Sequence, residues 1–225
     1  MDATSIESQR IADPVSASRS FIRRSRAWIS LLLLAPATLL AIFSRPHFTG
    51  ETLAETGVEV FAWLLFLAGG SLRWWSTLYI GGRKTNNSLI NGHALVVDGP
   101  YSVCRNPLYL GTLLLCLSVG VFTQSLILIG AMFLVTLIYL RITVPVEEER
   151  LASVFGEEYR EYLRRVPRLI PNFSLYHSPR EVTVRMNGLR AEFLRMLQWG
   201  SIPALWYLLE HLRLLSWWPT PFNLP

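Results

Sequence analysis

The sequence predicts an all-α, polytopic membrane helical protein with four or five transmembrane helices. Of the 225 residues, 51% are hydrophobic, and the mean hydropathy is +0.33, which is more apolar than a soluble domain needs. A helix that crosses a bilayer takes roughly 20 mostly apolar residues. Four stretches approach that length, namely 27–43, 58–80, 108–122 and 126–140.

The segment 1–26, which is polar and rich in Ser, Ala and charge over its first part, is predicted to be a mobile cytoplasmic tail. The apolar stretch 27–43 then resembles a signal peptide, because Ala35 and Ala37 resemble a cleavage site. Its leading region is long and further apolar stretches follow, so we interpret it as an uncleaved anchor.

Basic residues predict the orientation in the membrane. The formal net charge is +5 with 21 Lys and Arg. Arginines cluster before the first apolar stretch, recur in the loop 81–107 and recur after the fourth stretch. The loop between the first and second stretches has only Arg45. By the positive-inside rule these three regions face the cytoplasm. The basic charge therefore predicts membrane lipids as partners and no nucleic acid, in a plasma or bacterial inner membrane.

The loop 81–107 is too long to be an idle linker in so compact a protein. At its end, Asn106 followed by Pro107 predicts the start of a helix. The free N–H groups of that helix would face the loop and attract an anion such as a carboxylate or phosphate. Tyr101 and Tyr109 flank this point, and tyrosine rings suit stacking on a base or facing a cation.

The segment VPVEEERLASVFGEEYREYLRRV predicts one amphipathic helix that starts near Pro145. Its apolar face has five members: Leu151, Val154, Phe155, Tyr159 and Tyr162. At about 100° per residue, Glu147 and Glu148 fall at or beside this face, whereas Glu149 and Arg150 point away. Two carboxylates are therefore predicted to face inward.

The C-terminal extension 172–225 begins with a polar stretch up to Arg195 and continues with an apolar helix over 196–218. That helix holds four tryptophans together with Glu210, His211 and Arg213. It is either a fifth crossing or a helix that lies in the membrane interface, and its interior charges favour the interface.

The sequence predicts no metal site. Its two cysteines, Cys104 and Cys116, lie in the loop and inside an apolar stretch, and four dispersed histidines add no ligand spacing. A nucleotide-binding glycine fingerprint and an internal repeat are also missing from the sequence. No pattern indicates an oligomeric state.

Two blocks of sequence identify a family. HALVVDGPYSVCRNPLYLG, residues 93–111, resembles the first signature of the isoprenylcysteine carboxyl methyltransferases, which are related to the phospholipid methyltransferases. EERLASVFGEEYREYLRRVPRLIP, residues 148–171, preceded by Glu147, resembles the second signature. Both blocks occur in order around an apolar hairpin, and the resemblance runs from about residue 63 to 171.

The resemblance implies a membrane methyltransferase domain at 27–171 that uses S-adenosylmethionine in a cytoplasmic cofactor cleft. Its acceptor would be a hydrophobic small molecule or a lipidated one, resident in the membrane. Carried over by position, the cofactor-binding residues would be His93, Ala94, Leu95, Val96, Tyr101, Asn106, Pro107, Leu108, Tyr109, Glu147 and Glu148. The carboxylate of the cofactor suits a helix N-terminus, and its ammonium suits a glutamate.

Two positions depart from the family pattern. Asn106 replaces the common histidine, and asparagine cannot titrate near neutral pH. Thr143 stands where members that act on prenylcysteine have an arginine. The candidates for positioning the substrate are Arg73, Arg141 and Arg105. Arg73 lies inside an apolar stretch, where it either snorkels to the surface or binds an acidic group of the substrate.

Two alternatives stay open at this stage. The first is a sterol-reductase-like membrane oxidoreductase that uses NADPH and shares the R-x-P-x-Y region. Those reductases carry an aspartate-glutamate pair and a tryptophan where this chain has Glu147, Glu148 and FGEEY. The second is a noncatalytic membrane protein that retains the fold, for which Asn106 and Thr143 are the best arguments.

Overall fold

The computed structural model describes residues 14–43, 52–80, 90–91, 94–182, 184, 186–213 and 215. The longer helices are α2 (Pro14–Phe43), α3 (Leu53–Ile80), α5 (Pro107–Thr123), α6 (Leu126–Ile138), α7 (Val144–Phe155) and α9 (Met186–Arg213). The shorter elements are α4 (Pro100–Val103), α8 (Glu157–Arg165), the π-helical turn η1 (Tyr139–Thr143) and the 3-10 turn η2 (Phe173–Leu175). The predicted helical class is confirmed for these residues.

A small antiparallel pair of strands lies in the loop 81–107, where no strand was predicted. Strand β1 (Ile90–Asn91) pairs with β2 (Ala94–Leu95), so that Ile90 lies opposite Leu95. The pairing involves only two residues on each strand, which is too short for a periodic pattern to show in the sequence.

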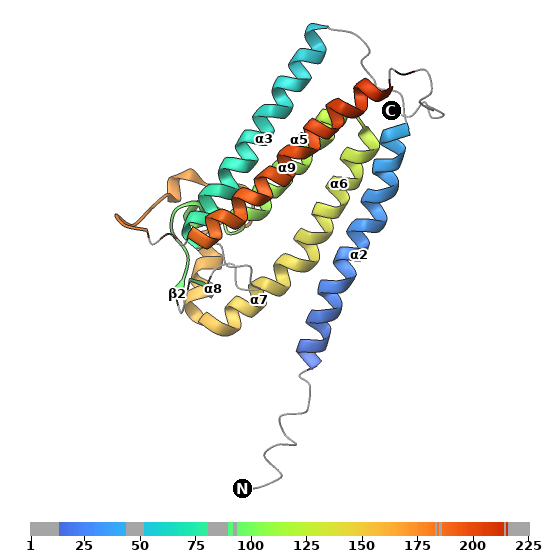
Figure 1. Ribbon diagram of the computed structural model, residues 1–225. Coiled ribbons are helices and arrows are strands. Elements are labelled where there is room, and N and C mark those ends of the chain that lie inside the picture. The colour runs from blue at the N-terminus through green and yellow to red at the C-terminus, as the bar shows by residue number, and fades with distance from the viewer. Residues whose placement is uncertain are drawn as a thin grey trace.

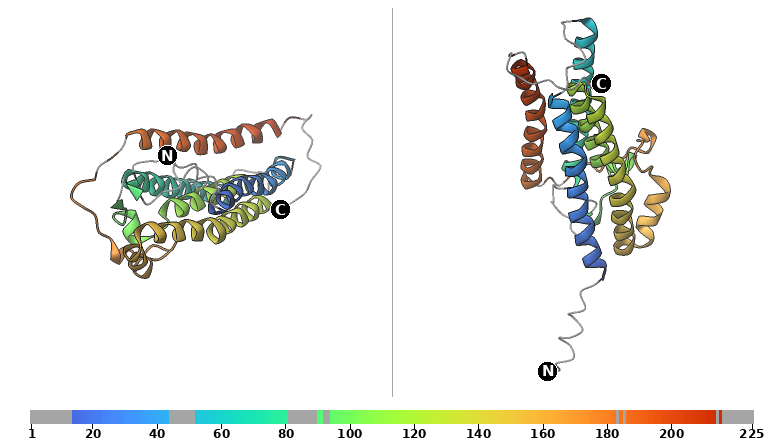
Figure 2. Two further views of the ribbon diagram at one scale, coloured as in Figure 1. Left: turned by 90° about the horizontal axis from the view of Figure 1, so that it is seen from below. Right: turned by 90° about the vertical axis from the view of Figure 1, so that its right-hand side faces the viewer.

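Five long helices form an elongated bundle, with α5 packed against α3, α6 and α9, and α2 packed against α6 (Figure 1). Seen from below, α9 covers one side of the bundle and α6 the other, with α3, α5 and α2 between them (Figure 2, left). Helices α4, α7 and α8 gather at one end. That end also holds the C-terminal end of α3 and the first turn of α5.

All four predicted apolar stretches are helical. Helix α3 and the continuous helix Leu126–Phe155 are long and apolar enough to cross a membrane, and the apolar parts of α2 and α5 are shorter. Large apolar side chains on the outside are more than half exposed, among them Leu64, Leu67, Phe133 and Leu205. Surfaces of this kind suit contact with lipid rather than water.

Helix α2 begins at Pro14, so the part of the predicted mobile tail from that residue to 26 is helical. Residues 1–13 lie outside the described residues. The apolar stretch 27–43 therefore does not begin a helix but forms its C-terminal half.

The predicted helix start near Pro145 is wrong, because α6 continues through η1 into α7 without a break. Proline cannot donate the main-chain hydrogen bond that a regular α-helix needs at this position. In η1 the N–H of Val144 instead bonds to the carbonyl of Tyr139, five residues back. The π-helical turn thus carries the rod past the proline.

The predicted single helix after Pro145 is also divided in two. Gly156 has φ 58° and separates α7 from α8, a conformation that glycine adopts without strain. Of the predicted apolar face, Leu151, Tyr159 and Tyr162 are buried and Phe155 packs against them, but Val154 is exposed.

Helix α9 begins at Met186, ten residues before the predicted start. Residues 186–195 were predicted to be part of a polar stretch before the helix, and they include Glu192, which is fully buried in the bundle. Helix α9 runs alongside α3 and in the opposite direction, so that Arg213 reaches the carbonyls of Ala41 and Ile42 at the end of α2 (Figure 1). Helix α9 is therefore packed lengthwise in the bundle, although it is not among the helices that are long and apolar enough to cross a membrane.

Candidate functional site

The two signature blocks meet at one end of the bundle. The hydroxyl of Tyr162 in α8 donates a 2.8 Å hydrogen bond to the main-chain carbonyl of Tyr101 in α4, 61 positions away in the sequence. Both side chains are buried in one apolar cluster. The other buried members of the cluster are Ile80, Val96, Leu151, Tyr159 and Val166.

The segment 166–178 follows α8 and is tied across α4 by main-chain hydrogen bonds. The N–H of Arg105 donates to Pro167 O over 2.9 Å, the N–H of Asn172 donates to Val103 O over 2.9 Å, and the N–H of Gly99 donates to His177 O over 2.8 Å. These bonds hold the segment against the residues that flank and end α4.

Cys104 lies beneath this segment, and its thiol donates to the carbonyl of Leu169 over 3.2 Å. Burial raises the pKa of the thiol to about 11. A thiol with that pKa stays protonated near neutral pH, so Cys104 is not activated as a thiolate there.

Gly99 allows the chain to enter α4. Its φ is 59°, and a Cβ atom at this position would lie 2.2 Å from the ring of Tyr79. Only glycine satisfies both the left-handed backbone and the close approach of the ring. The tight entry brings Tyr101 directly into the buried cluster.

The central polar contact joins Tyr109 and Glu147. The Tyr109 hydroxyl donates to Oε2 of Glu147 over 3.2 Å. Tyr109 lies in the first turn of α5 and Glu147 in the first turn of α7, and both are half-buried. The structure therefore brings together one predicted cofactor contact from each signature block.

Glu148 is buried but turns to different partners. Arg168 Nη2 donates to Oε2 of Glu148 over 2.6 Å, and Arg105 Nη1 lies 3.2 Å from its Oε1. The second contact is an ion pair without a directed hydrogen bond, since Oε1 has no hydrogen-bond partner. Glu148 and Arg105, predicted to bind cofactor and substrate, thus pair with each other; their predicted roles stay predictions.

The Tyr101 hydroxyl is buried and has no hydrogen-bond partner among the described residues. Burial raises its pKa well above the ordinary value, and the charges of Tyr162 and Glu147 raise it further, while Arg73 lowers it. Tyr101 is therefore a neutral phenol whose hydroxyl has no hydrogen-bond partner among the described residues, and the charge of Glu147 acts on it. A buried polar atom without a partner is uncommon in folded proteins.

Most of the remaining predicted cofactor residues lie in β2, in the buried apolar cluster or at the start of α5. Leu95 and Leu108 pack against the buried cluster that contains Val96, Pro107 is buried, and Ala94 lies in β2. Asn106 precedes α5 as predicted, but its side chain does not cap the helix and instead donates to Arg168 O over 3.2 Å. His93 lies outside the described residues.

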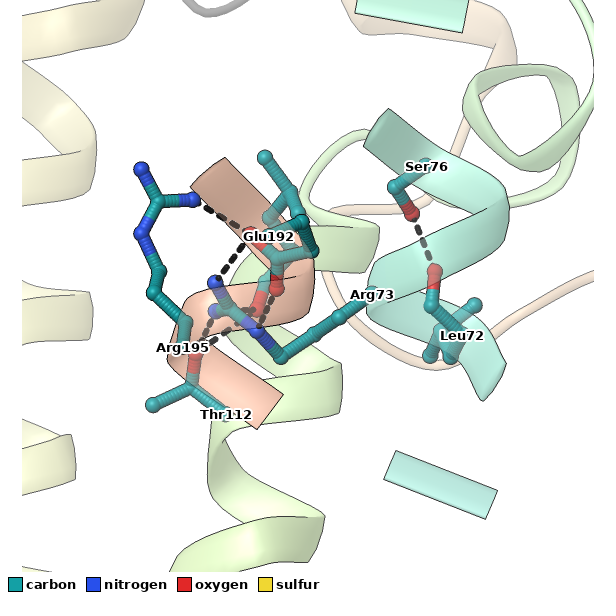
Figure 3. A network of polar contacts seen from close by, with 7 residues as sticks. Leu72, Arg73, Ser76, Thr112, Glu192 and Arg195 are labelled. Carbon is teal, nitrogen blue, oxygen red and sulfur yellow. Dashed lines mark hydrogen bonds and ion pairs between the residues drawn. The ribbon is translucent and has the colours of Figure 1, made fainter. Parts of the chain in front are cut away.

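The three candidate arginines have different surroundings. Arg73 does not snorkel, because its guanidinium lies in the bundle and pairs with Glu192 of α9 (Figure 3). Arg141 is exposed on η1. Thr143, which replaces the arginine of prenylcysteine-specific members, is buried.

The sequence prediction missed Arg168 and Glu192. Arg168 lies in the second block, in the loop VPRLIP, where no periodicity indicates which side chain turns inward. One feature of the sequence could have indicated Glu192: it lies four positions after Gly188, so that both residues share what proves to be a buried face of α9.

Residues 58–158 match the phospholipid methyltransferase family. The cobalt-zinc-cadmium resistance protein CzcN of Cupriavidus metallidurans is 33% identical over 196 residues, which cover 84% of this chain and 84% of the relative. The chain belongs to the phospholipid methyltransferase family.

Other relatives in this comparison are named for their reactions. Protein-S-isoprenylcysteine O-methyltransferase B of Arabidopsis thaliana is 27% identical over 157 residues, which cover 65% of this chain and 80% of the relative. Methanethiol S-methyltransferase 1 of Bradyrhizobium diazoefficiens is 39% identical over 71 residues, which cover 32% of this chain and 24% of the relative. No solved structure matches the chain.

The predicted resemblance and the predicted methyltransferase class are thereby confirmed, and this phospholipid methyltransferase family member is a membrane protein. The finding goes against the reductase and the noncatalytic alternatives. The family match ends at residue 158, so α9 lies beyond it. Among the residues that the structure describes, no group of three or more His, Cys, Asp and Glu side chains could hold a metal ion.

Proposed function

We propose that this protein is an integral membrane methyltransferase that binds S-adenosylmethionine between α4, α5 and α7 and methylates a hydrophobic acceptor from the bilayer. The observation that carries the proposal is the contact between Tyr109 and Glu147, at the end of the bundle that also holds the Tyr101 hydroxyl, which has no partner among the described residues. The charge of Glu147 acts on Tyr101, which supports a common site.

The residues present fit the cofactor. Glu147 offers a half-buried carboxylate for an ammonium group, and the first turn of α5 offers main-chain N–H groups for a carboxylate. Val96, Leu95 and Leu108 supply apolar surface for an adenine ring. The Tyr101 hydroxyl would hydrogen-bond a polar atom of the cofactor.

When bound, S-adenosylmethionine supplies an electrophilic methyl group on its sulfonium. The side chains of the site hold the cofactor and exclude water, and positioning of the acceptor in line with that methyl group supplies most of the rate. Tyr101 and Cys104 both stay protonated near neutral pH, because burial raises the pKa of each. Neither is proposed as a base.

The acceptor is proposed to be hydrophobic because the outside of the bundle offers an apolar approach. An open groove of about 390 Å³ lies over α3 and α9, and its lining includes Phe66, Gly70, Trp74 and Met196. The relatives named above act on a lipidated cysteine or a small thiol, so lipid, isoprenoid and thiol acceptors are all members of the proposed class.

The proposed topology is multi-pass, with the N-terminus and the active site in the cytoplasm. The described part of the loop before α4, the α7–α8 region and the N-terminal end of α2 lie at the same end of the bundle (Figure 1). These are the regions in which arginine is enriched, and that agreement supports the positive-inside prediction.

Isothermal titration of S-adenosylmethionine into the detergent-purified full chain tests the proposal. Glu147→Gln and Tyr109→Phe are each expected to weaken binding about tenfold or more, because a charge-assisted contact is lost. Glu149→Gln is the matched control, since that neighbouring carboxylate is exposed. Absence of binding by the unmodified protein would overturn the proposal, and NADPH would then be titrated to test the reductase reading.

A further inference from the structure

Helix α9 contributes a fully buried carboxylate to the bundle. Glu192 has no exposed side-chain surface, and Arg73 of α3 is only 12% exposed. Arg73 Nε donates to Oε1 of Glu192 over 2.7 Å, and Nη2 donates to Oε2 over 3.2 Å (Figure 3). Arg195 also donates to Oε2. A two-point contact of this kind fixes the plane of the guanidinium.

The remaining nitrogen of Arg73 reaches α5. Nη1 donates to the hydroxyl of Thr112 over 2.5 Å and to the carbonyl of Leu108 over 3.4 Å. The Thr112 hydroxyl donates to the same Leu108 carbonyl over 2.9 Å. Arg73 therefore joins the buried carboxylate of α9 to the first turn of α5, at the residue before Tyr109.

The helices are shaped around this arginine. A Cβ atom at Gly111 would lie 2.6 Å from Cγ of Arg73 and 2.9 Å from the carbonyl of Gly69. A Cβ atom at Gly69 would in turn lie 2.8 Å from the carbonyl of Gly111. Two glycines thus let α3 and α5 approach closely and leave room for the stem of Arg73.

Arg73 and Glu192 depend on each other for charge compensation. An unpaired charge inside a membrane bundle is energetically costly, so removal of either partner would leave the other as an unpaired buried charge. The charges of Arg73 and Glu147 both act on the Tyr101 hydroxyl. The network is therefore close to the groups proposed to hold the cofactor.

We propose that Glu192 is a positioning residue for the methyltransferase site: it orients Arg73, and Arg73 fixes the first turn of α5, which carries Tyr109 toward Glu147. This inference rests on the proposed function, because it takes the Tyr109–Glu147 contact to be part of the cofactor site. It gives α9, which lies beyond the family match, a role in the chemistry.

A double-mutant cycle on cofactor binding tests the inference. Dissociation constants for S-adenosylmethionine are measured by isothermal titration for the full-length protein, Glu192→Gln, Tyr109→Phe and the double variant. If Glu192 acts through Tyr109, Glu192→Gln weakens binding about tenfold, and Tyr109→Phe adds little in its presence. A merely structural role would instead give effects that multiply.

Glu210→Gln is the matched control, because it makes the same change on the same helix at the opposite end, where Glu210 accepts a 3.0 Å bond from Trp206. It is expected to leave the dissociation constant unchanged. If Glu192→Gln does not fold, the cycle is run with Arg73→Lys, which keeps the charge beside Glu192 but loses the fork that reaches Leu108.

The outcomes separate the two proposals. Binding by the unmodified protein, with Glu192→Gln equal to Glu210→Gln or with multiplying effects, overturns the inference and leaves the proposed function standing. No binding by the unmodified protein overturns both. Non-multiplying effects beside an unaffected Glu210→Gln support the inference.

Discussion

Tyr162 and Tyr101 are joined by a buried hydrogen bond in which the phenol of α8 donates to the main chain of α4 over 2.8 Å. Each residue belongs to a different signature block, so this bond fastens the two halves of the site to each other. It occupies the Tyr162 hydroxyl and leaves the Tyr101 hydroxyl for another partner. The two tyrosines of this cluster therefore differ: the hydroxyl of Tyr162 is hydrogen-bonded, and that of Tyr101 has no partner among the described residues.

The variant Tyr162→Phe is expected to destabilise the protein by about 1–3 kcal/mol, because the buried carbonyl of Tyr101 loses its partner. Thermal unfolding in detergent measures the change. Tyr176→Phe serves as the control, since Tyr176 is half exposed and lies outside the buried cluster. Equal melting temperatures for the two variants would contradict the prediction.

Gly70 lines the groove over α3 and α9, and a Cβ atom there would meet only the sulfur of Met196, at 3.4 Å. Gly70→Leu is therefore expected to fold and to fill the groove. We predict slower transfer of labelled methyl from S-adenosylmethionine into a lipid extract, with unchanged cofactor binding. Gly57→Leu, on the same helix with open space around it, should leave transfer unchanged; a similar loss there would count against the groove.

Alkaline pH is expected to destabilise the protein through Cys104. Burial raises the pKa of its thiol from an ordinary value of 9.0 to about 11, so the folded state disfavours the thiolate. The stability contributed by the neutral thiol is complete below pH 9 and is lost as the pH rises from about 9 to about 11, by about 3 kcal/mol in total.

Melting temperatures of the Cys116→Ala protein with and without Cys104→Ala, measured between pH 8 and 11, check this prediction. The variant that lacks Cys104 should lose less stability over this interval, so that the two curves converge at high pH. Parallel curves would show that Cys104 does not titrate there.

Five crossings from a cytoplasmic N-terminus would leave the C-terminus on the far side of the membrane. Alkaline phosphatase fused after residue 225 is therefore expected to be active in a bacterial host, because the enzyme works only outside the cytoplasm. The same fusion after residue 182, before α9, should be inactive. Inactivity of both fusions would mean that α9 does not cross.

The lengths of the apolar stretches predict the helices of the bundle. A chain segment inside a bilayer must satisfy its own main-chain hydrogen bonds, as a helix does. The start of α5 at Pro107 follows from local chemistry, since Asn-Pro favours that boundary. The proximity of Tyr109 and Glu147 was implied only by the two resembling blocks.

Other features depend on contacts between distant parts of the chain. Glu192 looks like a residue of a polar linker until Arg73, 119 positions earlier, is placed beside it. Glu148 was predicted to bind the cofactor together with Glu147, but in the structure it forms an ion pair with Arg168. The break at Gly156 needs a positive φ that glycine permits without requiring it, so the sequence alone could not distinguish one helix from two.

The segment 166–178 is held to α4 largely through peptide groups, since N–H and carbonyl groups form the bonds at Arg105, Asn172 and Gly99. Bonds of this kind survive replacement of most side chains. The outward-facing side chains of this segment can therefore change, and with them the chemistry of the surface at this end of the bundle, without loss of the bonds that hold the segment in place.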